Sequence, residues 1–153
     1  MELQETVRVT GWGYEGRTVA DLVEFARAID AALVVDIRLN ATSRKRDFSK
    51  TRLSENLQED GIKYLHLPEL GNPKDNREAF ASPGSAANLI AHARFAHEVL
   101  DSDTGQSAVR LVAGAAERGP VILLCYERDE ACCHRAPVIE AVERLVQASL
   151  LTR

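Results

Sequence analysis

Four short stretches of the chain carry the hydrophobic pattern of β-strands. Residues 33–37 and 121–124 are continuous apolar runs, which is typical of strands buried on both faces of a sheet. Residues 6–10 and 62–67 instead alternate between apolar and polar positions. We therefore predict four strands, with a glycine-rich turn over residues 11–14 directly after the first.

Five stretches have apolar residues at helical spacing. Thr18 and Asp21 form an N-terminal capping pattern before the first of them, and Gly61 is a stop signal after the second. The predicted helices cover residues 18–30, 51–60, 86–100, 104–118 and 136–148, the third and fourth being two helices or one interrupted helix. Strands alternating with helices predict an α/β fold of three layers, in which a mostly parallel sheet of about four to five strands carries helices on both faces. The connection over residues 68–85 is long and rich in turn-forming residues, which is typical of a functional loop or lid.

Length and composition suit an ordinary globular protein. The 153 residues are 45% hydrophobic and 27% charged, and we expect a single domain spanning residues 1–153. No apolar stretch approaches the roughly 18 residues of a membrane span, and the acidic N-terminus is unlike a secretory signal. We therefore expect a cytoplasmic protein with no membrane contact.

The charge pattern narrows the choice of partners. A net charge of −4 argues against a broad surface that coats nucleic acid. Residues 43–52, however, hold five basic residues and one acidic residue. Such a run is most often a solvated loop, but it also suits a phosphate, so nucleic acid stays open as a partner through this loop.

All three cysteines lie between residues 125 and 133, and two of them are adjacent. They cannot form a disulfide framework, so in a reducing compartment we predict thiols or metal ligands. Cys133 next to Arg135, in the first turn of the last helix, would be a nucleophile, although a small buried residue is an equally good interpretation. A phosphatase-like cysteine loop is disfavoured, because the position six residues after Cys125 holds Ala131 instead of arginine.

A metal is the weaker interpretation of the same residues. Candidate zinc ligands are Cys125, Cys132 or Cys133, His134 and His66. Their spacing is not that of a known zinc finger, so we assign no metal ligand, and the sequence requires no cofactor.

Polar residues follow the predicted strands, at the edge where parallel sheets bind ligands. Arginines there suit bidentate binding of phosphate or carboxylate, and one carboxylate could serve as general acid or base. The predicted substrate-binding residues are Gly11, Gly13, Tyr14, Arg38, Ser43, Arg44 and Arg135. The predicted catalytic residues are Glu127 or Asp36 for proton transfer, together with Cys133 and His134. The competing interpretation of the acid–arginine pairs is structural ion pairing.

Several short motifs, in order, resemble the DUF488 family of bacterial and archaeal proteins, which is named for having no assigned function. The motifs are the glycine-rich turn at 11–14, V-D-I-R at 35–38, Ser43-Arg44, Phe48, Y-L-H-L-P-E-L-G at 64–71, L-C-Y-E at 124–127 and C-H-R at 133–135. Many relatives continue into a further strand after the last helix, whereas this sequence ends at Arg153. The resemblance implies a shared α/β fold and a polar site, but no reaction.

Taken together, these patterns predict a hydrolase or transferase that binds a small anionic ligand. The expected substrate bears phosphate and is nucleotide-like or a nucleic-acid base, held by arginines while a carboxylate transfers protons. Two alternatives stay open: a thiol- or metal-dependent enzyme that uses Cys125 and Cys133, and a non-catalytic module that binds nucleotide or nucleic acid.

Overall fold

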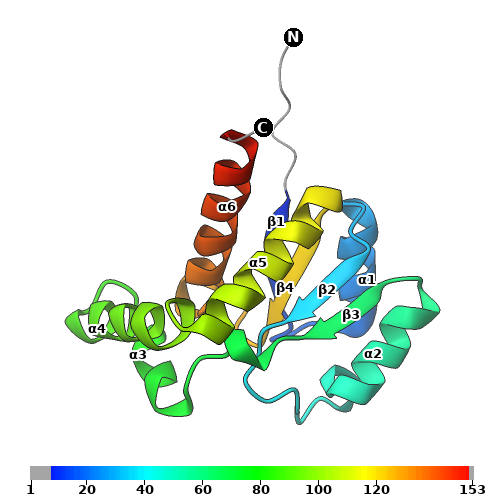
Figure 1. The fold of residues 1–153 in the computed structure, drawn as a ribbon. Coiled ribbons are helices and arrows are strands. Elements are labelled where there is room, and N and C mark those ends of the chain that lie inside the picture. Colours follow the sequence, from blue (N-terminus) through cyan, green and yellow to red (C-terminus); the bar gives the residue numbers. More distant parts are fainter. Residues whose placement is uncertain (1–7, 152–153) are drawn as a thin grey trace.

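The computed structural model describes residues 8–151, and its centre is a four-stranded parallel sheet (Figure 1). The strands are β1 (Val9–Gly13), β2 (Leu33–Asp36), β3 (Lys63–His66) and β4 (Val121–Cys125). Their order across the sheet is β1-β4-β2-β3, and each neighbouring pair is parallel. The α/β prediction with a parallel sheet is confirmed. Residues 6 and 7 of the predicted first strand lie outside the described residues.

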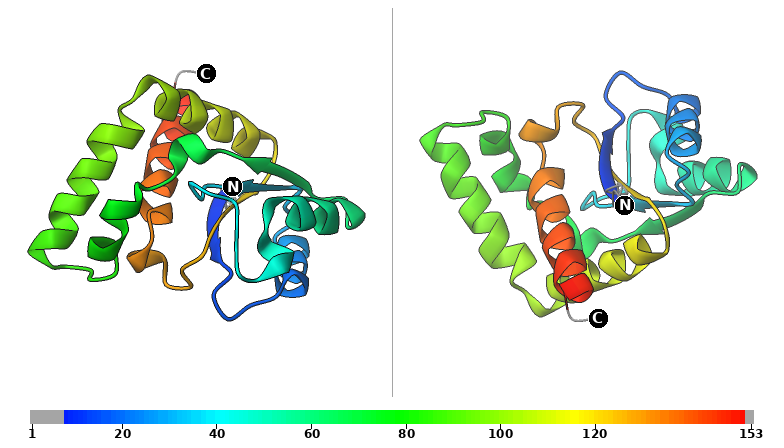
Figure 2. Two further views of the ribbon diagram at one scale, coloured as in Figure 1. Left: turned by 90° about the horizontal axis from the view of Figure 1, so that it is seen from below. Right: turned by 90° about the horizontal axis from the view of Figure 1, so that it is seen from above.

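Helices cover both faces of this sheet (Figure 2). The α-helices are α1 (Val19–Ala28), α2 (Lys50–Glu59), α3 (Arg77–Phe80), α4 (Ala86–Phe95), α5 (Asp103–Arg118) and α6 (Arg135–Leu151). Shorter helical segments are η1 (Arg46–Phe48), η2 (Pro68–Leu70), η3 (Lys74–Asn76), η4 (Ala96–Leu100), which is π-helical, and η5 (Glu130–Cys132). Within residues 8–151, no helix is both long and apolar enough to cross a membrane.

The alternation of side chains along β4 divides the core into two layers. Ile122 and Leu124 pack with α1 and α2 on one face of the sheet. Leu123 and Cys125 point to the opposite face and pack with α5 and α6. All five residues of β4 are buried, as expected for a central strand covered on both sides. This alternation decides which side chains can meet at the end of the sheet.

Three local predictions differ from the structure. The predicted turn at residues 11–14 is mostly strand, because Gly11–Gly13 pair with β4 in extended conformation. The last helix begins at Arg135, so Cys133 lies before its first turn, in extended conformation. Residues 68–85, predicted as a loop, contain the short helices η2, η3 and α3.

Candidate functional site

A cavity of about 510 Å³ opens where the strands end. Its walls come from the segments that follow β1, β2 and β4, and from the connection after β3. Ligands of open parallel sheets bind at this edge. The lining residues with reactive or polar side chains include Tyr14, Arg38, Ser43, Arg44, Lys45, Asn72, Arg77, Cys125, Tyr126, Glu127, Cys132, Cys133 and His134.

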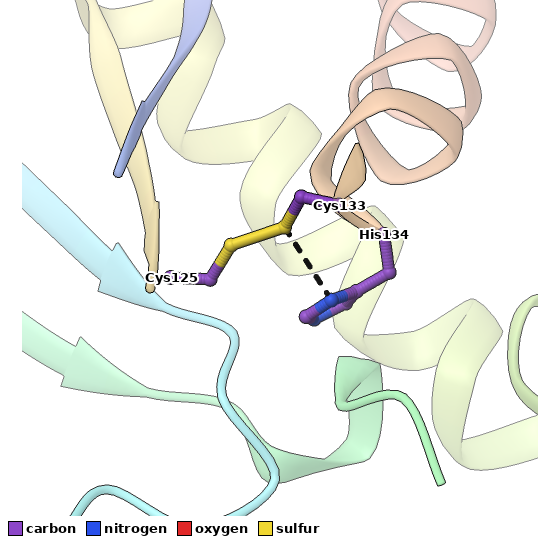
Figure 3. Close-up of side chains that lie close together, drawn as sticks. All are labelled: Cys125, Cys133 and His134. Carbon is purple, nitrogen blue, oxygen red and sulfur yellow. Dashed lines mark hydrogen bonds between the residues drawn. A yellow bond between two sulfur atoms is a disulfide. The ribbon is translucent and has the colours of Figure 1, made fainter. Parts of the chain in front are cut away.

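The floor of the cavity is a disulfide between Cys125 and Cys133 (Figure 3). Cys125 is the last residue of β4, and Cys133 stands two residues before α6. Each is only 1% exposed. The end of β4 and the start of α6 bring the two cysteines into contact, and the structure shows them oxidised. The prediction of thiols or metal ligands applied to a reducing compartment, and it stays a prediction. Cys132 is free, and burial raises the pKa of its thiol, which the nearby Asp129 carboxylate raises further.

His134 lies against the same pair of sulfur atoms. Its Nδ1 is 3.6 Å from Cys133 Sγ, and its Nε2 is 2.8 Å from the carbonyl oxygen of Ile37. A carbonyl oxygen only accepts hydrogen bonds, so Nε2 carries the proton and Nδ1 presents a lone pair to the sulfur. Burial lowers the pKa of His134 to about 4, which keeps the imidazole neutral near pH 7.

Arg135 contacts both sulfur atoms of the disulfide. Its Nη1 is 3.3 Å from Cys125 Sγ, and its main-chain N is 3.4 Å from Cys133 Sγ. The side chain is 1% exposed, and Nε has no hydrogen-bond partner among the described residues, although Glu130 Oε1 lies 3.9 Å away. Burial lowers the pKa of Arg135. Arg135 thus places a hydrogen-bond donor against each sulfur atom of the disulfide.

Arg135 does not line the 510 Å³ cavity with the other predicted anion-binding residues. It lines a second cavity, of about 670 Å³, together with Gly11 and Gly13 of β1. A Cβ atom on Gly13 would lie 2.6 Å from Arg135 Nη1 and would collide with the carbonyl group of Glu127. The three predicted binding residues Gly11, Gly13 and Arg135 therefore pack against one another instead of lining the 510 Å³ cavity.

Asp36 and Arg38 form a closed ion pair on the α1/α2 side of the sheet. Asp36 accepts hydrogen bonds from Arg38 Nε at 2.8 Å and Arg38 Nη2 at 2.6 Å, and also from the hydroxyl of Tyr64 at 2.5 Å. Asp36 is fully buried and Arg38 is 7% exposed. The prediction of a free catalytic carboxylate at Asp36 is wrong, because both of its oxygens are occupied by these donors and it does not line the cavity. Its two hydrogen bonds hold the Arg38 guanidinium in place.

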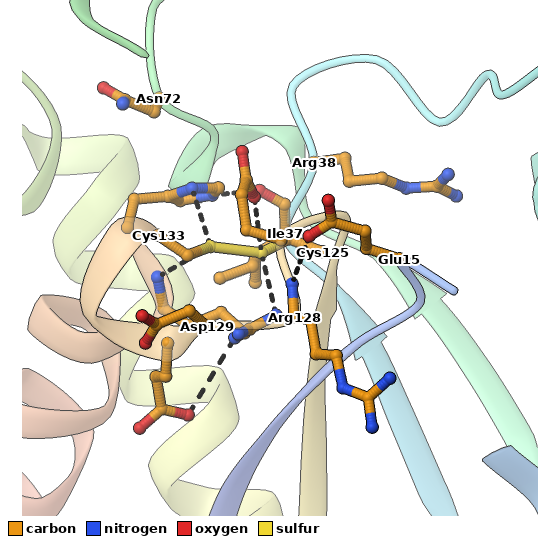
Figure 4. Close-up of a disulfide and its surroundings, with 12 residues drawn as sticks. Glu15, Ile37, Arg38, Asn72, Cys125, Arg128, Asp129 and Cys133 are labelled. Atoms are coloured by element: carbon orange, nitrogen blue, oxygen red, sulfur yellow. Dashed lines mark hydrogen bonds and ion pairs between the residues drawn. A yellow bond between two sulfur atoms is a disulfide. The ribbon is translucent and has the colours of Figure 1, made fainter. Parts of the chain in front are cut away.

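The same pair shifts two pKa values. Burial alone would lower the pKa of Arg38, but the hydrogen bonds and charge of Asp36 outweigh it and raise that pKa. Burial, followed by the hydrogen bond to Asp36, raises the pKa of Tyr64. Arg38 thus stays a cation, and Tyr64 stays a neutral donor. The Arg38 side chain points away from the disulfide and forms a separate wall (Figure 4), where Nη1 donates to the Tyr14 hydroxyl at 3.3 Å.

Glu127 is the carboxylate that remains at the cavity. It follows β4, is half-buried, and places Oε2 3.4 Å from Cys125 Sγ. Of the two carboxylates predicted for proton transfer, only Glu127 therefore borders the space that a substrate could enter.

The mouth of the cavity is cationic and partly aromatic. Arg44 is exposed, Lys45 donates to the main-chain carbonyls of Tyr14 and Arg17 at 3.3 and 3.1 Å, and Arg77 also lines the cavity. Tyr126 is 47% exposed and meets the ring of Tyr14 edge-on, with centroids 5.3 Å apart. Arg38, Arg44, Lys45 and Arg77 outnumber the single carboxylate of Glu127, so the lining carries a positive net charge.

Seven of the predicted site residues meet at this cavity: Tyr14, Arg38, Ser43, Arg44, Glu127, Cys133 and His134. The prediction missed Asn72, Arg77 and Phe80, which come from the connection after β3. The unusual length of that connection was the available signal, but length does not tell which of its side chains turn inward. Asn72 is held in place by Asn76, whose amide donates to Asn72 Oδ1 at 3.0 Å.

Comparison with known families agrees with the motifs that form this site. The family model described as "Domain of unknown function DUF488" matches residues 18–142, which is most of the chain. The chain belongs to the DUF488 family. The matched segment contains every residue of the cavity listed above except Tyr14, which stands just before it. No curated protein and no solved structure matches the chain.

Proposed function

We propose that this DUF488 protein is a hydrolase or group transferase whose small anionic substrate binds in the 510 Å³ cavity. The observation that supports this most is that a cationic mouth and a reactive floor border the same space. Arg44 and Arg77 suit a phosphate or carboxylate, because a guanidinium binds both groups through paired hydrogen bonds. The rings of Tyr14 and Tyr126 border the same space and suit the planar base of a nucleotide-like substrate.

Glu127 is the residue that we propose for proton transfer. In a hydrolysis, its carboxylate would take a proton from the attacking water and return it to the leaving group, so that no net proton is gained or lost. A well-placed general base contributes about 10²- to 10⁴-fold to such a reaction. Asp36 cannot share this role, since its oxygens are engaged by Arg38 and Tyr64.

A thiol-dependent enzyme is the second candidate, and one specific contact favours it. Arg135 Nη1 lies 3.3 Å from Cys125 Sγ, and a neighbouring guanidinium stabilises a thiolate. After reduction of the disulfide, Cys125 would be the nucleophile and Cys133 the residue that closes the disulfide again. A module that only binds nucleotide or nucleic acid is the remaining alternative.

Turnover by matched variants distinguishes these functions. The reduced protein is assayed against p-nitrophenyl phosphate and a set of nucleoside mono- and diphosphates, with product release measured. We expect turnover of at least one compound and a loss of about 10²-fold or more in Glu127→Gln. Glu55→Gln is the control, because Glu55 is exposed on α2, away from the cavity. Equal rates in Glu127→Gln and wild type would refute the role of Glu127, and binding without any product would identify a recognition module.

A further inference from the structure

We infer that the reduced Cys125–Cys133 pair and His134 form a zinc site at the floor of the cavity. The inference goes beyond the proposed function, because metal binding there does not require that the cavity be an active site. Three ligand atoms, one from each residue, lie within 4.8 Å of one another. All three residues are buried, and their side chains lie close together (Figure 3). Two thiolates and one imidazole are a donor set that favours zinc over magnesium or calcium.

The orientation of His134 supports metal binding at Nδ1. The imidazole donates its Nε2 proton to the carbonyl oxygen of Ile37 at 2.8 Å, so the lone pair is on Nδ1, beside Cys133 Sγ. Histidines that bind metals almost always donate their other ring N–H to a carbonyl or carboxylate in this way. The ring is therefore already oriented as a zinc ligand requires.

The spacing of the two cysteines also suits a bridging ion. Their Cα atoms are 7.7 Å apart. Disulfide-bonded cysteines are usually about 4.4–6.8 Å apart at Cα. Two zinc–sulfur bonds of about 2.3 Å at a tetrahedral angle separate the sulfur atoms by roughly 3.8 Å, which accommodates a wider spacing of the backbone.

Hydrogen-bond donors support both sulfur atoms as thiolates. Nη1 of Arg135 points at Cys125 Sγ, and the main-chain N of the same residue points at Cys133 Sγ. Two thiolates balance the charge of Zn²⁺, while Arg135 adds a cation that is balanced in part by Glu130 at 3.9 Å. Such donors around a metal centre orient its ligands and tune their basicity.

The oxidised and metal-bound forms exclude each other. A dithiol reductant supplies two electrons and two protons to the disulfide, which becomes two thiols while the reductant becomes a disulfide. Zinc then displaces the two thiol protons and binds both sulfurs and Nδ1. With three protein ligands, the fourth position is left for water or substrate on the cavity side, which is the arrangement of catalytic zinc sites.

Cys132 provides a matched control, because it is adjacent in sequence but not part of the ligand set. Its Sγ lies 3.9 Å from the Ala81 carbonyl oxygen and 3.7 Å from Asp129 Oδ2. Replacing it removes a thiol from the same short segment without touching the predicted ligands.

The experiment titrates the reduced protein, freed of reductant under anaerobic conditions, with Zn²⁺ and separately with Co²⁺. We expect one ion per chain, release of protons on zinc binding, and thiolate-to-cobalt charge-transfer absorption. Cys132→Ser should behave like wild type, whereas Cys125→Ser and His134→Gln should each weaken binding by at least about 100-fold. Circular dichroism of each variant verifies that it is folded.

Three results would overturn the inference: no stoichiometric binding by the reduced wild type, no charge-transfer band with Co²⁺, or equal affinity in folded Cys125→Ser and His134→Gln. Equal binding by the oxidised protein would identify an adventitious ion only. Turnover without zinc binding would refute the zinc site and leave the proposed function standing. Zinc binding without turnover of any anionic compound would support the zinc site and contradict the proposed function.

Discussion

Asp36 and Arg38 show how one buried pair shapes the wall of the cavity. Asp36 has no exposed surface, so its charge must be matched inside the protein. Arg38 supplies the counter-charge, and Tyr64 donates a further hydrogen bond. The pair holds Arg38 against Tyr14, at a fixed place in the lining.

Replacing Asp36 should therefore destabilise the fold. In Asp36→Asn, the buried Arg38 loses its counter-charge, and we expect the free energy of unfolding to fall by about 3–5 kcal/mol. Urea denaturation measures this change. Tyr64→Phe, which removes only one hydrogen bond to the same carboxylate, should cost about 1 kcal/mol. A loss below about 1 kcal/mol in Asp36→Asn would show that the pair is not needed for stability.

Replacing Arg44 should weaken the binding of an anionic ligand in the cavity. Arg44 is exposed and lines the cavity, whereas Arg46, in the adjacent helix η1, is also exposed but does not line it. Arg44→Gln should weaken the binding of an anionic ligand about fivefold, which corresponds to roughly 1 kcal/mol for an exposed charge. Calorimetric titration with a nucleoside monophosphate tests this, and an equal loss in Arg46→Gln would indicate general attraction by the loop instead of a site.

Asp36 and Glu127 were both predicted to transfer protons, but their side chains point to different places. The prediction placed Asp36 correctly at the end of a strand but did not include the direction of its side chain. Residues two apart on a strand share a face, so Asp36 points with Val34 toward α1 and α2. Glu127 follows the end of β4, where the chain has left the sheet, and no periodicity predicts its direction. The structure was needed to show that Glu127 lines the cavity and Asp36 does not.

At the scale of elements, helices were predicted more accurately than turns. The apolar spacing and the Thr18–Asp21 capping box predict α1 within two residues at its end, and the capping box is present in the structure. The glycines of β1 were interpreted as a turn because glycine often marks one. Here they are extended, and their missing side chains make room for Arg135, which comes from a helix more than a hundred residues later in the chain.

Because of this packing, a side chain at position 13 should destabilise the fold. In Gly13→Ala, the new methyl group meets the Glu127 carbonyl and Arg135 Nη1, so we expect a loss of roughly 1–3 kcal/mol in unfolding free energy and a loss of turnover. Gly114→Ala is the control: Gly114 lies inside α5 with no atom within 4 Å of the new methyl group, so alanine should stabilise the helix by up to about 1 kcal/mol. Thermal unfolding compares the two, and an unchanged Gly13→Ala would contradict this account of β1.

At the scale of the whole molecule, strand order determines which residues meet. The order β1-β4-β2-β3 places the ends of β1 and β2 on either side of β4, so Tyr14, Arg38 and Glu127 border one cavity. The sequence predicted that the strand ends would gather polar residues, but it did not give the order of the strands, because parallel neighbours are selected by packing between distant elements. For the same reason it did not predict that Arg135 would line a second cavity.

The most direct test of the account is to map where a small anion binds on the intact protein. We would follow the backbone amide resonances of the labelled protein by NMR during titration with adenosine monophosphate. The account predicts that the largest shifts occur at Tyr14, Arg44 and Tyr126, around the 510 Å³ cavity. Shifts concentrated at Arg17 and Phe25, around the second cavity, or no saturable shifts at all, would contradict it.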